Sequence, residues 1–111
     1  MRIVYSTFPK KEEAVRVGKE LLKERLIACY NAFQISSGYW WEGKIVKDEE
    51  WAVFFKTREE LVEKVMEKIK ELHPYSVPAI FVIPVEKIHE PYDRWLVEET
   101  GGEEGEQADN P

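Results

Sequence analysis

The sequence predicts an α+β domain with the order β-α-β-β-α-β and a short helix after the last strand. Two observations carry this prediction. β-branched and aromatic runs alternate with stretches of helical period, and a long predicted strand is joined to its return strand by a Glu-Gly turn. The length of 111 residues is that of one domain. This order is typical of the ferredoxin-like fold, an antiparallel sheet with both helices on one face.

The first half of the chain supplies a strand, a helix and a long strand. RIVYSTF (2–8) is β-branched and aromatic, which favours a strand that ends at Pro9. The next stretch has helical period, and its apolar face consists of Ala14, Val17, Leu21 and Leu22. Residues 27–41 are apolar and aromatic with a break at Gly38, and predict a long strand.

The third strand and second helix follow the turn at Glu42-Gly43. Residues 44–56 return the chain along the long strand. Thr57 and Glu60 have the spacing of a capping box, which predicts a helix start, and Glu60 and Lys64 form a possible i,i+4 pair. The apolar face of this helix consists of Leu61, Val62, Val65, Met66, Ile69 and Leu72.

The chain ends with a strand and a short helix. Pro74 stops the second helix, and AIFVIPV (79–85) is a continuous apolar strand. Pro91 is well placed to begin a last helix that presents Tyr92, Trp95 and Leu96 together.

Composition indicates a soluble globular protein. The chain is 43% hydrophobic and 34% charged, with no apolar run near the roughly 20 residues that span a bilayer. The N-terminal sequence lacks the features of a signal peptide, so we expect a cytoplasmic protein. The single cysteine, Cys29, excludes an internal disulfide and a paired-cysteine metal motif. Abundant Glu and Lys with few Asn and Gln are compatible with a thermophilic source.

Much of the net charge of −6 lies at the C-terminal end. Residues 101–111 hold four of the 22 acidic residues and no basic one, which leaves residues 1–100 with a net charge of −2. Because a nucleic-acid-binding domain needs a concentrated basic face, we expect no nucleic-acid partner. The sequence predicts one domain over residues 1–100 and an acidic, flexible tail over residues 101–111.

The predicted sheet carries more apolar surface than one subunit can bury. An antiparallel strand with one face in water alternates apolar and polar residues. WAVFF (51–55) and AIFVI (79–83) are instead apolar at every position. We therefore expect self-association through the open face of the sheet. The alternative is a larger core within the chain, with Trp95 of the last helix packed on the hairpin.

The aromatic triplet of the hairpin supports the same expectation. Tyr39 and Trp41 point to one face of the strand and Trp40 to the other. Three such side chains offer roughly 600 Å², the upper end of what a monomer leaves exposed as one patch.

Three other ferredoxin-like classes do not fit. A heavy-metal-associated domain needs two cysteines after the first strand, where this chain has Ser6-Thr7-Phe8-Pro9. An RNA-recognition motif needs stacking aromatics in a basic strand pattern, which WAVFFK (51–56) lacks. An acylphosphatase needs a Gly-rich phosphate cradle with an arginine after the first strand, and that loop has neither.

Five motifs, in order and with compatible spacing, closely resemble the CutA family of divalent cation tolerance proteins, over essentially residues 2–99. They are RLIACYN (25–31), YWWEGKI (39–45), KTR (56–58), HPYSVPAI (73–80) and YDRWL (92–96). The resemblance implies a ferredoxin-like subunit in a compact homotrimer whose hairpins cross between subunits, and an association with tolerance to copper and other divalent metals. The expected trimer interface contains Tyr39, Trp40, Trp41 and Trp51.

His73 and Cys29 are the candidate metal ligands, for Cu²⁺ or another divalent cation. His73 is the histidine of the family's His-Pro-Tyr motif, and an imidazole can bind copper or zinc. Cys29 matches the family's Ala-Cys motif. His73 can instead bond free helix carbonyls, and Cys29 can be a small buried side chain. Some members assigned copper carry a second histidine and a first-strand cysteine where this chain has Leu72 and Ser6.

Lys56 and Tyr75 are the candidate residues of a ligand cleft. Lys56 can contact an anion where the strand meets the helix, or be an ordinary surface lysine. Tyr75 can close a cleft or hydrogen-bond across the trimer. His89 fits a loop, and the run of Asp48, Glu49 and Glu50 fits a solvated charged surface better than a site for a hard cation.

The leading hypothesis is a non-enzymatic homotrimer that binds divalent metal weakly or in a regulatory way. No arrangement of nucleophile, base and orienting group is visible in the sequence. One alternative is a PII-like signalling trimer that binds a small anionic ligand or a protein partner in clefts between subunits, with Lys56 as the charged contact. The other is an enzyme of unknown reaction. No membrane partner and no organic cofactor are expected.

Overall fold

The predicted order of strands and helices is confirmed in the computed structural model, which describes residues 1–102. The elements are β1 (Arg2–Phe8), α1 (Lys11–Lys23), β2 (Cys29–Trp41), β3 (Lys44–Thr57), a 3-10 turn (Glu59–Leu61), α2 (Val62–Leu72), β4 (Ile80–Pro84) and α3 (Glu90–Glu99). Residues 103–111, most of the predicted tail, lie outside the described part, so its flexibility stays a prediction.

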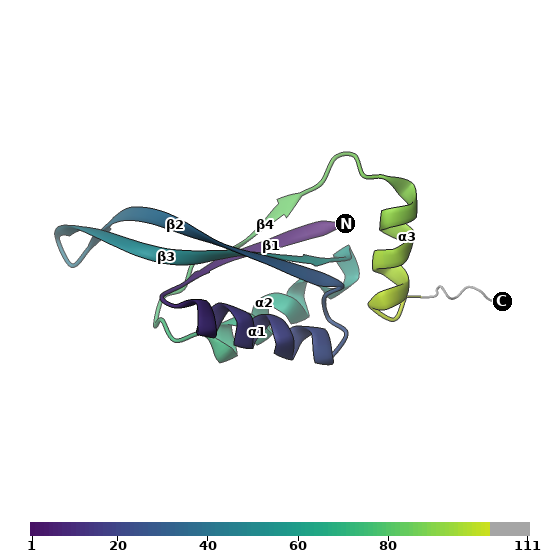
Figure 1. Ribbon diagram of the computed structural model, residues 1–111, viewed down its shortest axis with the longest axis horizontal. Helices are drawn as coiled ribbons and strands as arrows, with labels where there is room; N and C mark the ends of the chain where they lie inside the picture. Colours follow the sequence, from purple (N-terminus) through teal and green to yellow (C-terminus); the bar gives the residue numbers. More distant parts are fainter. Residues whose placement is uncertain (103–111) are drawn as a thin grey trace.

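The four strands form one antiparallel sheet in the order β2-β3-β1-β4. The helices α1 and α2 lie together on one face of it, and α3 stands at the end opposite the hairpin tip (Figure 1). Pro91 occupies the first turn of α3, as predicted. Arg58 attaches α3 to the sheet, since its Nε donates to Thr100 Oγ1 at 3.0 Å.

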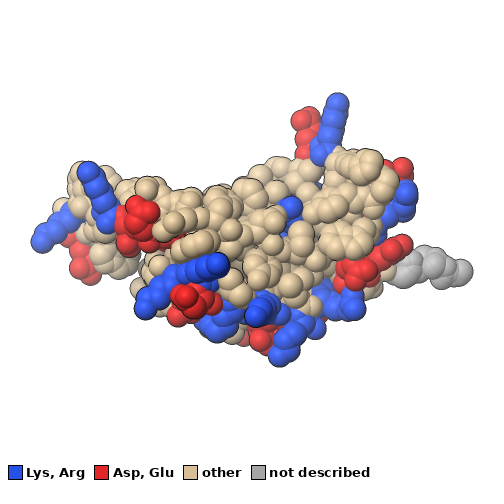
Figure 2. Space-filling model, viewed as in Figure 1, with Lys and Arg blue, Asp and Glu red and all other residues tan. Residues whose placement is uncertain are grey.

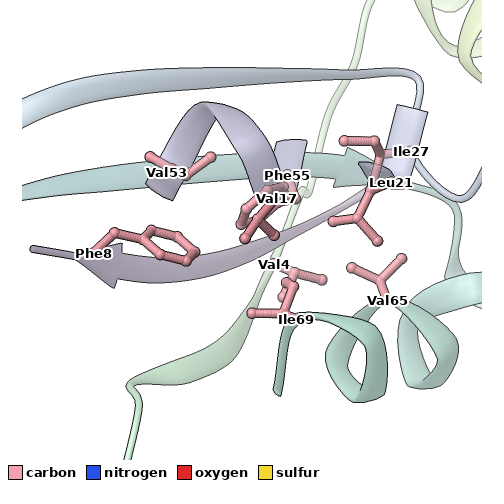
Figure 3. Close-up of a cluster of buried hydrophobic side chains, with 10 residues drawn as sticks. Val4, Phe8, Val17, Leu21, Ile27, Val53, Phe55, Val65 and Ile69 are labelled. Carbon is pink, nitrogen blue, oxygen red and sulfur yellow. The ribbon is translucent and has the colours of Figure 1, made fainter. Parts of the chain in front are cut away.

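The hydrophobic core lies between the sheet and α1 and α2 (Figure 3). Its fully buried members from the strands are Val4, Phe8, Val53 and Phe55, and those from the two helices are Ala14, Val17, Leu21, Val65 and Ile69. Leu22 departs from the predicted apolar face of α1 and is 38% exposed.

The predicted capping box is wrong. Thr57 is the last residue of β3, paired with Arg2, and its buried Oγ1 donates a 2.6 Å hydrogen bond to the Leu26 carbonyl. Because the sheet holds Thr57, the chain enters α2 through the 3-10 turn without a side-chain cap. Glu60 pairs with Arg58 at 3.4 Å, and no ion pair among the described residues joins it to Lys64.

The hairpin of β2 and β3 extends well beyond the rest of the sheet. β1 pairs with β3 only from Trp51 to Thr57, whereas β2 and β3 continue as a two-stranded arm to the pair Trp41↔Lys44. The radius of gyration is therefore 15.4 Å, against roughly 13 Å for a compact domain of 100 residues. Glu42 and Gly43 both have positive φ at the tip, as a two-residue hairpin turn requires.

The face of the sheet away from α1 and α2 is aromatic and uncovered. Tyr5 lies against Phe81 at a ring distance of 4.8 Å, and Phe33 against Phe54 at 5.2 Å. Phe33 is 39% and Phe81 48% exposed. Figure 2 shows the charged side chains gathered mainly over the helices and at the hairpin tip, with a largely uncharged expanse above the helix layer.

The last helix covers only one end of this open face, where Tyr92 lies beside Cys29 and Lys56, and leaves Phe33 and Phe81 exposed. Trp95 stacks on Tyr92 of its own helix at 5.5 Å and stays 39% exposed, while Leu96 is the buried residue of α3. The alternative of a larger core within one chain, with Trp95 on the hairpin, is therefore wrong. The excess of apolar surface expected from the sequence is present.

Candidate functional site

The predicted ligand residues fall into two separate groups. Cys29 pairs with Lys56 across β2 and β3, at the level of Ile3 in β1. His73 instead contacts Thr7, four residues further along β1. Four residues of strand correspond to about 13 Å, so the subunit does not bring Cys29 and His73 together.

Both ring nitrogens of His73 are engaged within the subunit. Nδ1 accepts a 3.1 Å hydrogen bond from the backbone N–H of Tyr75, which places the proton on Nε2. Nε2 then donates to the Thr7 carbonyl at 2.8 Å and lies 3.1 Å from Ser6 Oγ. The ring also stacks on Phe8 at 4.4 Å. Burial lowers the pKa of His73, so the neutral imidazole is favoured and leaves no free lone pair for a metal.

The backbone carbonyl at the end of α2, next to His73, accepts its hydrogen bond from a residue other than His73. His73 has extended backbone and makes its side-chain contacts with β1 rather than with the carbonyls of α2. Arg16 of α1 instead donates from Nη2 to the Leu72 carbonyl at 2.8 Å and to Glu13 at the same distance. Its role in joining the two helices was not visible in the sequence.

Glu50 was expected in a solvated charged run, and this expectation is wrong. Its side chain lies on the open face, opposite Ile35, and only 6% of the residue is exposed. Tyr75 comes over it from the loop before β4 and donates a 2.8 Å hydrogen bond to Oε2. Burial, and then the bond to Glu50, raise the pKa of Tyr75 well above its usual value. The alternation of β3, which puts Glu50 on the same face as Phe54, was the available signal.

Glu50 and Tyr75 belong to a groove of about 610 Å³ on the open face. The β2 side of the hairpin arm, from Ile35 to Trp41, forms one wall, and the loop before β4 forms the other. Its lining includes Tyr5, Thr7, Ile35, Tyr39, Glu50 and Tyr75. The groove thus combines five aromatic residues, Trp40 and Trp41 included, with one carboxylate.

The second group joins Cys29 and Lys56 to Tyr92, which sequence reasoning had not selected for a site. The Tyr92 hydroxyl lies 3.4 Å from Cys29 Sγ and 3.4 Å from Lys56 Nζ. Burial, together with the contact to Cys29, raises the pKa of Tyr92 to about 12. Lys56 Nζ also lies 5.7 Å from the centre of the Tyr92 ring. Within residues 1–102 no carboxylate lies within 4.0 Å of Lys56 Nζ.

The four aromatic residues expected at a subunit interface do not share one surface. Tyr39 and Trp41 lie on the open-face side of the arm, where they are 38% and 47% exposed. Trp40 points to the other side of the arm and is 72% exposed. Trp51 is partly buried on the helix-covered face, with Lys11 Nζ 5.6 Å from its ring centre.

Comparison with known proteins identifies the family. The sequence model of the CutA1 divalent ion tolerance protein matches residues 2–99. The chain belongs to the CutA1 family. The divalent-cation tolerance protein CutA of Thermotoga maritima is 54% identical over 98 residues, which cover 88% of this chain and 97% of that protein. The CutA of Pyrococcus horikoshii is 57% identical over 100 residues, covering 90% and 98%. The resemblance seen in the five motifs is confirmed.

Solved CutA1 structures have the same fold. CutA1 from Pyrococcus horikoshii aligns with a TM-score of 0.86 at 56% identity, covering 89% of this chain and 97% of that one. The periplasmic divalent cation tolerance protein CutA from Archaeoglobus fulgidus aligns with a TM-score of 0.87 at 40% identity, covering 90% and 99%. In the part of the chain that the structure describes, no helix is long and apolar enough to cross a membrane.

Proposed function

We propose that this protein contributes to divalent-metal tolerance as a homotrimeric, non-enzymatic binding protein of the cytoplasm. Family membership supports the metal role, because CutA relatives carry divalent-cation tolerance in their names. The observation that carries the oligomer is the uncovered aromatic face of the sheet, with Phe33 and Phe81 each more than a third exposed.

Three further features support assembly. The hairpin arm has only two strands, and such a ribbon is marginally stable by itself in water. The strands at the two edges of the sheet, β2 and β4, have no further neighbour among the described residues. Unpaired edges invite association. A second copy that covers the open face also supports the arm. Native mass spectrometry of the full chain is expected to give three times the subunit mass, and a monomer would overturn the assembly.

The residues of a single subunit do not fit a metal coordination sphere. Residues 1–102 contain no group of three His, Cys, Asp or Glu side chains placed to hold an ion. Zinc and copper sites in proteins use three or four such ligands. Coordination by His73 requires the loss of its bonds to Tyr75 or Thr7, and ligands beyond Cys29, which lies elsewhere. We therefore propose that any direct Cu²⁺ site involving these residues forms between subunits.

A calorimetric Cu²⁺ titration tests this part of the proposal. The full chain is titrated in its native assembly beside His73→Gln, with His89→Gln as the matched control. Saturable binding that disappears in His73→Gln alone would support direct metal handling. Equal binding by all three proteins would contradict a site at His73 and restrict the metal role to signalling.

A second function, a PII-like signalling trimer, is favoured by the position of Lys56. Its ammonium group lies on the open face beside Tyr92, without a carboxylate partner among the described residues. Such a group is free to bind a small anion in a cleft between subunits. ATP serves as a probe: a melting shift that is absent in Lys56→Gln would support this function. No shift with ATP or inorganic phosphate would contradict it.

A further inference from the structure

Glu50 is a nearly buried carboxylate without a basic partner. Only 6% of the residue is exposed, and Oε2 accepts the Tyr75 hydroxyl at 2.8 Å. Between residues 1 and 102, no Lys, Arg or His nitrogen lies within 4.0 Å of its oxygens, and no hydrogen bond engages Oε1. Oε1 is not among the fully buried atoms without a partner in residues 1–102, so it is accessible from the groove, where a cation can pair with it.

Three tyrosines line the groove that holds this carboxylate. Tyr5 lies on β1, Tyr39 on the hairpin arm and Tyr75 in the loop before β4, and all three line the same 610 Å³ space. Loss of solvent contact raises the pKa of each phenol. Glu50 raises the pKa of Tyr5 and Tyr75 further, whereas for Tyr39 the charge of Asp48 is the next cause and that of Glu50 follows it. The negative field of Glu50 therefore reaches all three rings, which come from separate parts of the chain.

We propose that this groove binds a small organic ammonium ion, with its cationic nitrogen beside Glu50 and among the rings of Tyr5, Tyr39 and Tyr75. Aromatic faces attract cations, and quaternary ammonium groups are bound in proteins by aromatic cages. The volume is within the range of about 300–1,000 Å³ typical of small-molecule sites. The unengaged Oε1 supplies the compensating negative charge.

The chemistry of the groove suits an organic cation better than a metal ion. Mg²⁺ and Ca²⁺ require six or more oxygen ligands. Glu50 is a single carboxylate, and no three-ligand group occurs in the described chain. Lys56 lies six residues along β3, about 20 Å away, so the proposed cation site is separate from the proposed anion contact.

The site consists of residues from one subunit and does not depend on the proposed trimer. Tyr39 also belongs to the expected interface, so a neighbouring subunit would close the outer side of the groove and leave Glu50 at its inner wall. A basic side chain of that neighbour is the competing occupant, and its presence would exclude the small cation.

Calorimetric titration of the full chain with choline, beside its uncharged isostere 3,3-dimethylbutan-1-ol, tests the proposal. We expect saturable binding of one choline per chain, and binding of the alcohol weaker by about tenfold or more. Glu50→Gln keeps the shape and an acceptor for Tyr75 but removes the charge, and is expected to weaken choline binding about tenfold or more. Glu49→Gln is the matched control, because Glu49 is exposed, faces the other side of β3 and bonds to Ser36. Its affinity should stay within about twofold of the parent's.

A second variant keeps the test decisive if Glu50→Gln does not fold. Tyr39→Leu removes one ring and leaves the carboxylate, and is expected to weaken choline binding about three- to tenfold. No choline binding by the parent protein, or equal binding of choline and the alcohol, would overturn the proposal. An equal loss in Glu49→Gln and Glu50→Gln would also overturn it. Sedimentation of the same samples measures the oligomeric state, so a failure of the trimer proposal is distinguished from a failure of choline binding.

Discussion

The two faces of this one sheet differ in how completely a single chain buries them. On the helix-covered face, Phe55 of β3 is fully buried against Phe8 and the helices. On the open face its neighbour Phe54 contacts Phe33, which remains 39% exposed. Both faces are apolar, so composition alone does not distinguish them. The helix-covered face forms the hydrophobic core of the subunit. The open face is an apolar surface that the single chain leaves uncovered and that we propose another copy covers.

The largest effect is expected from a substitution on the closed face. Phe55→Ala should cost about 3–5 kcal/mol of unfolding free energy, because it leaves a cavity in a packed core. Phe33→Ala, on the open face, should cost less at low protein concentration and show a loss that grows with concentration, since its contacts depend on assembly. Urea unfolding at two protein concentrations measures both. Equal costs for the two variants at low concentration would contradict the distinction between the faces.

A smaller effect is expected where α1 packs on β2. A Cβ built at Gly18 lies 2.6 Å from the Tyr30 ring, so Gly18→Ala forces that ring to move. We expect a loss of about 1–3 kcal/mol from overpacking, partly offset by the better helix propensity of alanine. In a Tyr30→Ala background the same change should stabilise the protein. Thermal melts of the four proteins decide this, and a destabilising Gly18→Ala in both backgrounds would exclude the close packing as the cause.

The smallest expected effect is a pH dependence of the unfolding free energy, caused by His73. Burial lowers the pKa of His73 below its unfolded value near 6.5, so the unfolded chain binds a proton first as the pH falls. Stability from this group is therefore present above about pH 6.5 and is lost as the pH falls toward the folded pKa. Urea unfolding between pH 7.5 and pH 5 should show this loss, and His73→Gln should reduce it while His89→Gln leaves it in place. An unchanged slope in His73→Gln would refute the assignment.

Strand and helix periods were sufficient to predict the order of elements and the excess of apolar surface. They also indicated most of the helix residues that form or border the core, except that Leu22 is exposed and Val62 is not part of the core cluster. The capping box at Thr57 failed because sheet pairing and the bond to Leu26 hold this residue in β3. Local spacing does not report such a tertiary constraint.

The candidate sites were harder to predict because their geometry depends on contacts between distant segments. His73 was selected from its motif, but its engagement by Thr7 and Tyr75 follows from how the end of α2 meets β1. Tyr92 meets Cys29 and Lys56 only because α3 packs at the end of the sheet. Glu50 is the last of three consecutive acidic residues, so the sequence does not distinguish it from its exposed neighbours. The register of β3 shows that it faces the groove.

Sedimentation equilibrium of the parent protein with two charge insertions tests the central claim that the open face joins copies of this chain. Phe81→Glu places a carboxylate on the open face, and Leu22→Glu places one on the helix side at a residue of comparable exposure, 38% against 48%. The account predicts three times the subunit mass for the parent and for Leu22→Glu, and a single subunit mass for Phe81→Glu. A monomeric parent, or a trimer that survives in Phe81→Glu and dissociates in Leu22→Glu, would contradict it.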